Sequence, residues 1–247
     1  MAPPRKTNTM KFSIVLTSVV FLSTSFLTCG LLNCEKGTGP VVERAVEVEP
    51  FHGLAVQGSM GVRLTPGPVQ RITVEGQSNL IDLLTTEVKH GIWRINTRKC
   101  FRTNEPFVVH ITMPTVDFLS MQGSGDITCL GRFSMPEIAL EVQGSGDMDL
   151  NVEVQRINAL IQGSGSIDLQ GTCGTLSATV QGSGDIDADA LTTRNVEATV
   201  QGSGDISALI TDTLTANIGG SGNIRYTGRP AVVNTNIAGS GEVKQDP

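Results

Sequence analysis

The chain has 247 residues, enough for one large domain or two small ones; 4% are aromatic, and glycine occurs 28 times. This composition suits a β-architecture with many turns and is too apolar for a disordered chain. The formal net charge is -6, which argues against the basic surface that nucleic acid needs, so we expect no nucleic-acid partner.

The first 33 residues have the pattern of a secretory signal peptide. Arg5, Lys6 and Lys11 form a basic start, and an apolar run follows from Phe12 to Leu32. The run is long enough to cross a bilayer, which leaves a membrane anchor as the alternative. Its many Ser and Thr residues favour the cleaved signal, so we expect an exported protein.

A cysteine follows this run, and its context resembles a bacterial lipobox. Leu31-Leu32-Asn33-Cys34 is the better match, and Phe26-Leu27-Thr28-Cys29 competes with it. We predict a lipid on Cys34, with residues 34–40 as a short polar tether, which would hold the protein at a membrane without a spanning helix. The expected location is the cell envelope, as an outer-membrane lipoprotein facing the periplasm or the outside.

Residues 41–247 are predicted to form one β-solenoid domain. Val41 to Val48 alternates apolar and polar residues and reads as a strand. A first, irregular coil is expected at 51–66, where Met60 stands in the place of a later glycine.

A β-rich insert is expected at 67–114, between the first coil and the second. Gln70 to Glu75 and Phe107 to Met113 alternate as strands, Asn79 to Leu84 could form a helical turn, and His90-Gly91 suits a hairpin turn. Trp93 is expected to pack this insert against the end of the solenoid as a cap.

Four cations in the insert, Arg94, Arg98, Lys99 and Arg102, form a small basic group near Cys100. We interpret it as a solvated face, with contact to an anionic glycan or lipid headgroup as the alternative. Cys100, Cys129 and Cys173 are odd in number, so at most one bridge is expected among them. Cys129 and Cys173 are expected to be small buried hydrophobes.

The regular coils, 115–243, repeat a Gly-Ser-Gly corner that is clearest in Val180-Gln181-Gly182-Ser183-Gly184-Asp185-Ile186. The first glycine of the corner recurs at steps of 21, 19, 19, 20, 18 and 19 residues: 123, 144, 163, 182, 202, 220 and 239. A fixed period near 20 predicts an all-β protein, a parallel β-helix or solenoid with coils of about 20 residues, and right-handed coiling is the expected hand. Alternating residues on either side of the corner predict two short strands per coil, with a less regular third side such as Ala190 to Asn195.

The corner itself has an architectural interpretation. Glycine permits a sharp turn and positive φ, and stacked serines could hydrogen-bond between coils. A glutamine precedes the first glycine in six coils and should form an amide ladder: Gln57, Gln122, Gln143, Gln162, Gln181 and Gln201.

The second interpretation concerns a column of acids that follows the corner. Its members occupy equivalent places in their coils, with Ser166 and Asn223 between them: Asp126, Asp147, Asp185, Asp205 and Glu242. Asp149, Asp168 and Asp187, two residues further on, thicken this acidic stripe. Such oxygen-rich edges can collect Ca²⁺, so the column is a candidate ion or ligand site, and Ca²⁺ is the one cofactor to consider.

Several segments together resemble a bacterial family, the putative auto-transporter adhesin head GIN domain. They are Cys34 to Gly39, Phe51-His52-Gly53-Leu54, Gly76 to Leu80, Glu87-Val88 and the repeated corners. The resemblance covers residues 35 to 243. It implies a β-helical fold in the cell envelope, and it carries no established activity, ligand or catalytic residue.

We therefore expect no enzyme and no catalytic residues. The leading hypothesis is a binding or adhesion module that presents a repetitive solenoid face to glycans or surface proteins. A polysaccharide-active β-helix enzyme is one alternative, but it needs a distinct acid pair or an acid with a positioned base. A structural envelope lipoprotein without a specific ligand is the other.

Overall fold

The structure is a computed structural model that describes residues 34–247. Residues 33–247 form one compact unit by themselves. The predicted signal peptide and the alternative bilayer-spanning run lie outside the described residues. Within the part that is described, no helix has the length and hydropathy needed to cross a bilayer.

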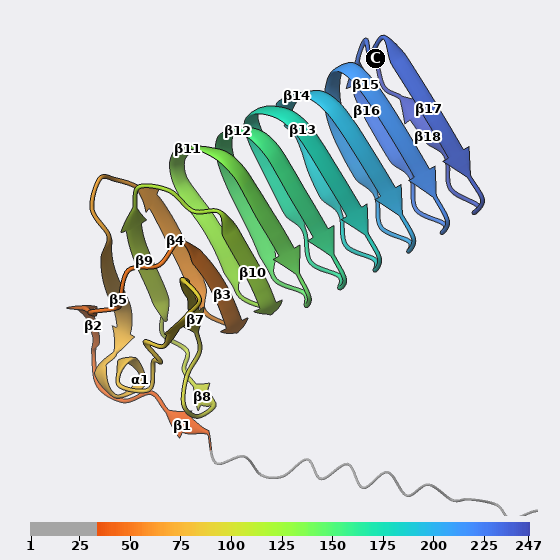
Figure 1. The fold of residues 1–247 in the computed structure, drawn as a ribbon. Helices are drawn as coiled ribbons and strands as arrows, with labels where there is room; N and C mark the ends of the chain where they lie inside the picture. The colour runs from red at the N-terminus through yellow and green to blue at the C-terminus, as the bar shows by residue number, and fades with distance from the viewer. Residues whose placement is uncertain (1–33) are drawn as a thin grey trace, which may run out of the picture. The chain divides into compact units, whose positions relative to one another are not determined.

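A stack of parallel strands builds a β-solenoid of about seven turns with coils of about 19 residues, which confirms the predicted fold class (Figure 1). β10 (Phe118–Gly123) begins the regular part. One long strand then forms each coil: β11 (Asp126–Val142), β12 (Asp147–Ile161), β13 (Ile167–Val180), β14 (Ile186–Val200) and β15 (Ile206–Ile218).

These long strands correct the expected division of each coil into two strands and an irregular side. The strand continues through the third side, because backbone pairing to the neighbouring coil persists there: Gly171 pairs with Leu191 and Thr172 with Thr192. Bulges absorb the bend, as the register shift between Asp168 and Gln170 shows. From β11 to β15 the strand is interrupted only at the Gly-Ser-Gly corners.

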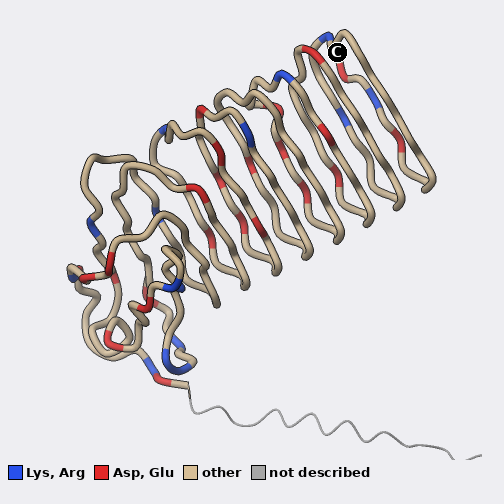
Figure 2. Tube along the Cα trace, viewed as in Figure 1, with Lys and Arg blue, Asp and Glu red and all other residues tan. Residues whose placement is uncertain are grey.

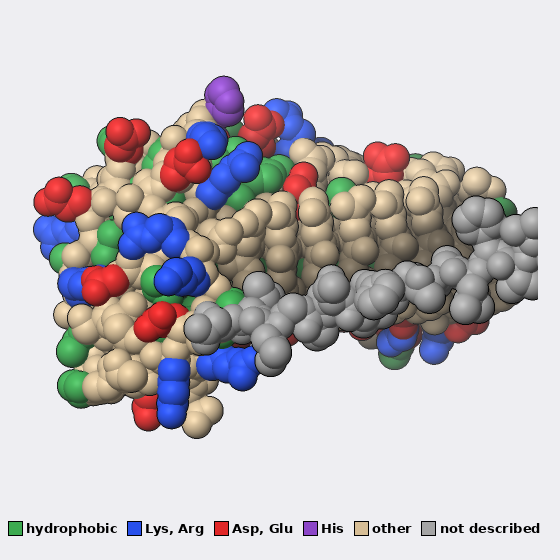
Figure 3. Space-filling view, turned by 90° about the horizontal axis from the view of Figure 1, so that it is seen from below, with side chains coloured by type: hydrophobic (Ala, Val, Ile, Leu, Met, Phe, Trp, Pro, Cys, Tyr) green, Lys and Arg blue, Asp and Glu red, His purple; other side chains and the backbone are tan. Residues whose placement is uncertain are grey.

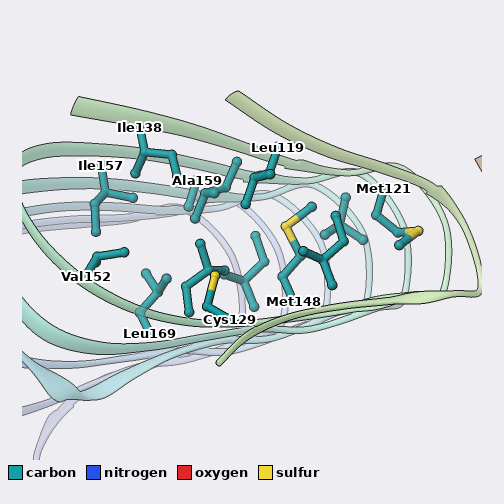
Figure 4. Close-up of a cluster of buried hydrophobic side chains, with 14 of the residues drawn as sticks. Leu119, Met121, Cys129, Ile138, Met148, Val152, Ile157, Ala159 and Leu169 are labelled. Carbon is teal, nitrogen blue, oxygen red and sulfur yellow. The ribbon is translucent and has the colours of Figure 1, made fainter. Parts of the chain in front are cut away.

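The core is one continuous cluster of apolar side chains enclosed by the coils. Leu119, Met121, Ile138, Met148 and Ile157 are at most 1% exposed and point into the space between the two sides of the stack (Figure 4). Strict alternation places them inside, since successive side chains of a strand point to opposite faces. Each coil contributes only a few such residues, so the core exists only where coils stack.

The insert adds a further layer beneath the first coil. β3 (Gly53–Gly58) and β4 (Gly61–Pro66) of that coil pair in parallel with β7 (Ile92–Ile95) and β9 (Val108–Met113). Three antiparallel pairs complete the sheet at this end: β5 (Arg71–Gln77) with β9, β2 (Val41–Ala45) with β5, and β6 (Val88–Lys89) with β7. The short helix α1 (Ser78–Ile81) follows β5.

Trp93 packs the insert against the solenoid, as the sequence predicts. It is fully buried, lies opposite Leu54 in the strand register, and its ring centroid is 5.4 Å from that of Phe51. Its indole N–H donates a hydrogen bond of 3.0 Å to the carbonyl oxygen of Thr85. His90 and Gly91 form the expected hairpin turn, with φ of 54° and 75°.

The segment predicted as a tether lies against the insert. β1 (Glu35–Lys36) pairs in parallel with β8 (Phe101–Arg102), and Cys34 is bonded to Cys100 in a disulfide. The amide of Thr38 donates a hydrogen bond of 3.0 Å to Asn79 Oδ1. The chain therefore enters the solenoid through a fixed two-stranded pair.

The last coil is formed by β16 (Ile224–Gly228), β17 (Val232–Ile237) and β18 (Val243–Gln245). β17 pairs with β15 alone, and all six of its residues are exposed. Lys244 and Asp246, 3.6 Å apart, place charges beside this edge.

Close packing between coils is what requires the corner glycines. A Cβ on Gly182 or Gly220 would overlap the backbone carbonyl of the corner glycine one coil earlier. Positive φ, the other reason predicted for glycine, occurs only at Gly58 among the corner glycines. That is the first corner, where Met60 replaces the second glycine and lies buried in the core.

Candidate functional site

The repeated corners lie one above another and form a continuous ridge, which we call the corner edge (Figure 3). In the regular coils its serine side chains are exposed to solvent, whereas the glycine after each serine is buried, except for the half-buried Gly241 of the last corner. The corner edge comprises residues 57–60, 122–125, 143–146, 162–165, 181–184, 201–204, 219–222 and 238–241.

Backbone hydrogen bonds join successive corners. The amide of Ser183 donates a 2.9 Å bond to the carbonyl oxygen of Gly163, and the amide of Ser203 donates an equal bond to Gly182. The expected contact between serine hydroxyls is thus made by serine amides. The hydroxyls remain at the surface, where each can donate and accept a hydrogen bond.

The predicted glutamine ladder forms in part. Gln57 Nε2 donates to Gln122 Oε1 at 2.9 Å, and Gln162 Nε2 donates to Gln181 Oε1 at 3.1 Å. Asn96 of the insert, which the sequence did not single out, extends the ladder by donating to Gln57 Oε1 at 2.7 Å. The pairing of β3 with β7 brings Asn96 beside Gln57, and that pairing cannot be read from the sequence.

The acidic column is brought together as predicted, with Asp126 opposite Asp147 in the register. Its carboxylates face the next coil rather than a shared centre. Asp147 Oδ1 accepts bonds of 2.8 Å from both the amide and the hydroxyl of Ser166, and Asp185 Oδ1 accepts one of 2.7 Å from the amide of Asp205.

The two residues that seemed to interrupt the column take part in the same pattern. Asp205 Oδ1 accepts a 2.7 Å bond from the amide of Asn223, and Asn223 Oδ1 accepts a 3.1 Å bond from the amide of Glu242. Arg225 pairs with the other carboxylate oxygen of Asp205 at 2.5 Å. An acceptor at this place therefore joins one coil to the next at four positions, whether it is an acid or an amide: Asp147, Asp185, Asp205 and Asn223.

A second row of acids runs beside the column. Asp149 lies opposite Asp168, and Asp168 opposite Asp187. Together with Leu169, Gln170 and Ala190 they line a shallow hollow of about 290 Å³. Burial, followed by the charges of Asp187, Asp149 and Asp147, raises the pKa of Asp168. Burial and the charge of Asp187 also raise the pKa of Asp189.

Across residues 34–247, no group of three or more His, Cys, Asp or Glu side chains has an arrangement that could hold a metal ion. The acids face along the stack, so each neighbour is one coil away and the oxygens do not converge. A calcium role for the column remains a prediction from the sequence.

The disulfide revises the predictions for the cysteines. The sequence predicts at most one bridge among Cys100, Cys129 and Cys173. In the structure Cys100 is bonded to Cys34 instead, with the two Cα atoms 4.7 Å apart. A sulfur atom in a disulfide has no free valence for a thioether to lipid. Lipidation of Cys34, which stays a prediction from the sequence, would require this bond to be absent.

The other two cysteines of the described chain behave as predicted. Cys129 and Cys173 are free and buried. Burial, with a contribution from Asp149, raises the pKa of the Cys129 thiol to about 12, and burial raises that of Cys173 to about 11. Both therefore stay protonated at neutral pH and act as apolar core residues.

These features define a β-solenoid protein with one polar, repeated edge and an N-terminal β-cap. Residues 50–230 match the family described as "Putative auto-transporter adhesin, head GIN domain". Because the match covers most of the chain, the protein belongs to this family.

Solved structures share the fold. A putative adhesin from Bacteroides fragilis is similar at a TM-score of 0.80 and 26% identity, over 85% of this chain and 99% of that one. A putative lipid binding protein from Parabacteroides distasonis has a TM-score of 0.72 at 23% identity, covering 86% and 99% of the two chains. A putative adhesin from Parabacteroides merdae has a TM-score of 0.68 at 20% identity, covering 86% of this chain and 98% of that one. No curated protein matches the chain.

Proposed function

We propose that the protein is a non-catalytic binding or adhesion module of the cell envelope, and that its corner edge is the binding surface. The observation that carries this proposal is the stacking of equivalent, exposed polar groups in register along the coils. Stacked strands repeat every ~4.8 Å, so the same donors and acceptors recur at a constant interval. An extended glycan or a flat protein surface could meet many of them at once.

The chemistry of the edge suits this role. Its exposed Ser hydroxyls and Gln amides offer both donors and acceptors, and the Asp carboxylates of the adjoining column add further acceptors. Their backbone is held by hydrogen bonds between coils, so little ordering would accompany binding, and a preorganised surface loses less entropy. Membership of an adhesin family supports the same reading, as do relatives whose names are those of adhesins rather than enzymes.

A binding screen tests the proposal. The compact unit, residues 33–247, would be applied to glycan and extracellular-matrix protein arrays with calcium and then with a chelator. Specific binding in either arm supports a recognition module, and loss in the chelator arm would assign an ion to the acidic column. Silence in both arms, combined with altered envelope integrity in a deletion strain, would instead favour a structural envelope protein.

Graded substitution distinguishes a repeated binding surface from a single catalytic centre. Because equivalent units share the contact, Gln162→Ala alone should weaken binding only slightly, and adding Gln143→Ala and Gln181→Ala should weaken it progressively. Loss of function from one substitution such as Asp185→Ala, with sugar release by the unaltered protein, would point to an enzyme and contradict the proposal.

We also propose that the protein is a lipoprotein anchored through Cys29. The Cys34 sulfur is bonded to Cys100, and Cys29 is the remaining cysteine with a lipobox-like context. Intact-mass analysis of membrane-extracted protein should show acyl groups that disappear in Cys29→Ser and persist in Cys34→Ser. An acylated chain that begins at Cys34, or a chain without acyl groups, would refute this anchor.

A further inference from the structure

A cavity lies beside the Cys34–Cys100 disulfide and, apart from Ser59, is not part of the corner edge. Its volume is about 810 Å³. It is lined by Cys34, which comes directly before β1, by Lys36 of β1, and by Phe101 and Arg102 of β8, and the segment after β8 supplies Thr103 to Glu105. The cavity therefore depends on the pairing of these two short strands.

Two cations stand side by side at this cavity. The register of β1 and β8 places Lys36 directly opposite Arg102, and both side chains line the cavity. Like charges directly opposite each other across two strands are unfavourable unless something compensates them. Among residues 34–247, no carboxylate lies within ion-pair distance of either cation, although Glu105 also lines the cavity.

The rest of the wall combines an aromatic surface with fixed polar groups. The rings of Phe101 and Phe107 lie 5.1 Å apart. Gln77 is held on both sides, because it donates to the carbonyl oxygen of Gly39 at 2.9 Å and accepts from the hydroxyl of Thr103 at 2.9 Å. Such a wall is rigid, with a flat apolar patch beside two positive charges.

A second, smaller cavity of about 320 Å³ adjoins the first and shares Ser59 and Phe101 with it. Asn96, Thr97 and Cys100 line its other side. The disulfide thus stands between two hollows, and Phe101 is exposed to both. A ligand larger than a single ion could occupy the pair.

The charge distribution would favour an anion at this end of the unit. Residues 34–114 carry nine Lys and Arg against eight Asp and Glu, whereas residues 115–247 carry six against sixteen. Asp and Glu recur on coil after coil in Figure 2. On the face seen in Figure 3, Lys and Arg lie over the insert, interspersed with Asp and Glu.

We propose that this cavity binds a phosphate group carried by a sugar or a lipid. Lys36 and Arg102 hold the phosphate, since guanidinium and ammonium groups form charge-assisted hydrogen bonds to phosphate oxygens. Phe101 packs against the ring or chain that carries it. The disulfide builds the site by fixing β1 against β8, so that the two cations stay opposite each other.

The test uses nuclear magnetic resonance titration of the ¹⁵N-labelled unit, residues 33–247. The probes are inorganic phosphate, glucosamine 1-phosphate, dihexanoyl phosphatidic acid and, as the neutral control, methyl N-acetylglucosaminide. We expect shifts in the amides of residues 100–105 with all three phosphates and none with the neutral sugar. Tighter binding of glucosamine 1-phosphate assigns a glycan phosphate, and tighter binding of phosphatidic acid assigns a lipid headgroup.

Matched variants distinguish phosphate binding at this cavity from non-specific attraction of anions to the protein's positive charges. Lys36→Met and Arg102→Gln should each weaken binding about tenfold or more, the loss expected for a hydrogen bond to a charged group. Arg229→Gln, an exposed arginine of the last coil, should leave binding within about twofold. Unchanged amide shifts in coils 147–218 would show that each variant is folded.

Reduction of the disulfide should weaken phosphate binding by a similar factor, because β1 is then free to leave β8. The proposal is overturned if phosphates cause no shifts in residues 100–105, or if Arg229→Gln weakens binding as much as Arg102→Gln does. Equal affinity for all three phosphates would keep the cation pair but remove the role given to Phe101. This proposal does not rest on the proposed function of the corner edge, so a binding screen that finds no ligand for that edge would not contradict it.

Discussion

Asp185 Oδ1 accepts a hydrogen bond of 2.7 Å from the backbone amide of Asp205, the residue at the same place one coil later. The carboxylate thereby satisfies a backbone donor that the Gly-Ser corner leaves without a strand partner. Bonds between a carboxylate and a backbone amide are among the stronger ones in proteins. The acids of the column therefore contribute to holding the coils together, whatever else they bind.

Removing this acceptor should destabilise the coil stack. We expect Asp185→Ala to lower the free energy of unfolding by about 1.5 kcal/mol, the lower end of the range for a bond to a charged group, and Asp185→Asn to lose less because an amide oxygen still accepts. Urea unfolding measures the difference. Asp126→Ala is the matched control, since the Asp126 carboxylate, unlike that of Asp185, accepts no hydrogen bond from the next coil. An equal loss in both variants would contradict this role.

Glycine at the corner should be required by contact and not by turn geometry. Gly220→Ala places a Cβ against the carbonyl of Gly202, so the coils must separate, and overpacking of this kind costs on the order of 2 kcal/mol. Gly219→Ala, one residue earlier, meets only the oxygen of Val200 at 4.0 Å and should be tolerated. Thermal unfolding of the two variants checks this, and similar melting temperatures would refute it.

The second acidic row should make stability depend on pH. The pKa of Asp168 is raised by burial and neighbouring acids, so its ionised form is disfavoured in the folded state. Below the ordinary value of 3.8 the group is protonated in both states and this penalty is absent; it grows as pH rises through the raised pKa.

Asp168→Asn should therefore raise the melting temperature at pH 7 and give no advantage near pH 3. Glu153→Gln is the control, because its register neighbours are Ser134 and Thr172 and no like charge is relieved. A gain for Asp168→Asn that persists unchanged at low pH would show that the cause is not ionisation.

The disulfide should stabilise the cap. It closes a loop with a sequence separation of 66, for which the chain-entropy account gives about 4 kcal/mol. We expect reductant to lower the melting temperature of the unaltered protein, and to have no effect on Cys34→Ser/Cys100→Ser, which should already melt at the lower temperature. Insensitivity of the unaltered protein to reductant would argue against a stabilising bridge.

The two core thiols should be inert in the folded protein. With the pKa of Cys129 raised to about 12 and that of Cys173 to about 11, the reactive thiolate is scarce at pH 8. Iodoacetamide should modify neither residue until urea is added, and mass spectrometry would then find both alkylated. Rapid modification of either one under native conditions would mean that its coil opens.

The sequence alone determined the solenoid and its contents. The period near 20 predicts stacked coils, and alternation around each corner decides which side chains lie inside, as the burial of Val180 and Ile186 confirms. Both signals are local and periodic, so they can be counted along the chain. The sequence also predicts that Trp93 packs the insert against the solenoid, because the one large aromatic side chain of a cap segment is expected to be buried at the solenoid end.

The tertiary structure decided what depends on distance in space. Cys34 joins Cys100 across 66 residues, and neither spacing nor context in the sequence pairs them. Lys36 faces Arg102, and Asn96 continues the glutamine ladder, only because the insert folds back beneath the first coil. The reason for the corner glycines is likewise a contact with the neighbouring coil. Periodic patterns specify what one coil repeats, whereas contacts between unlike segments appear only when the chain has folded.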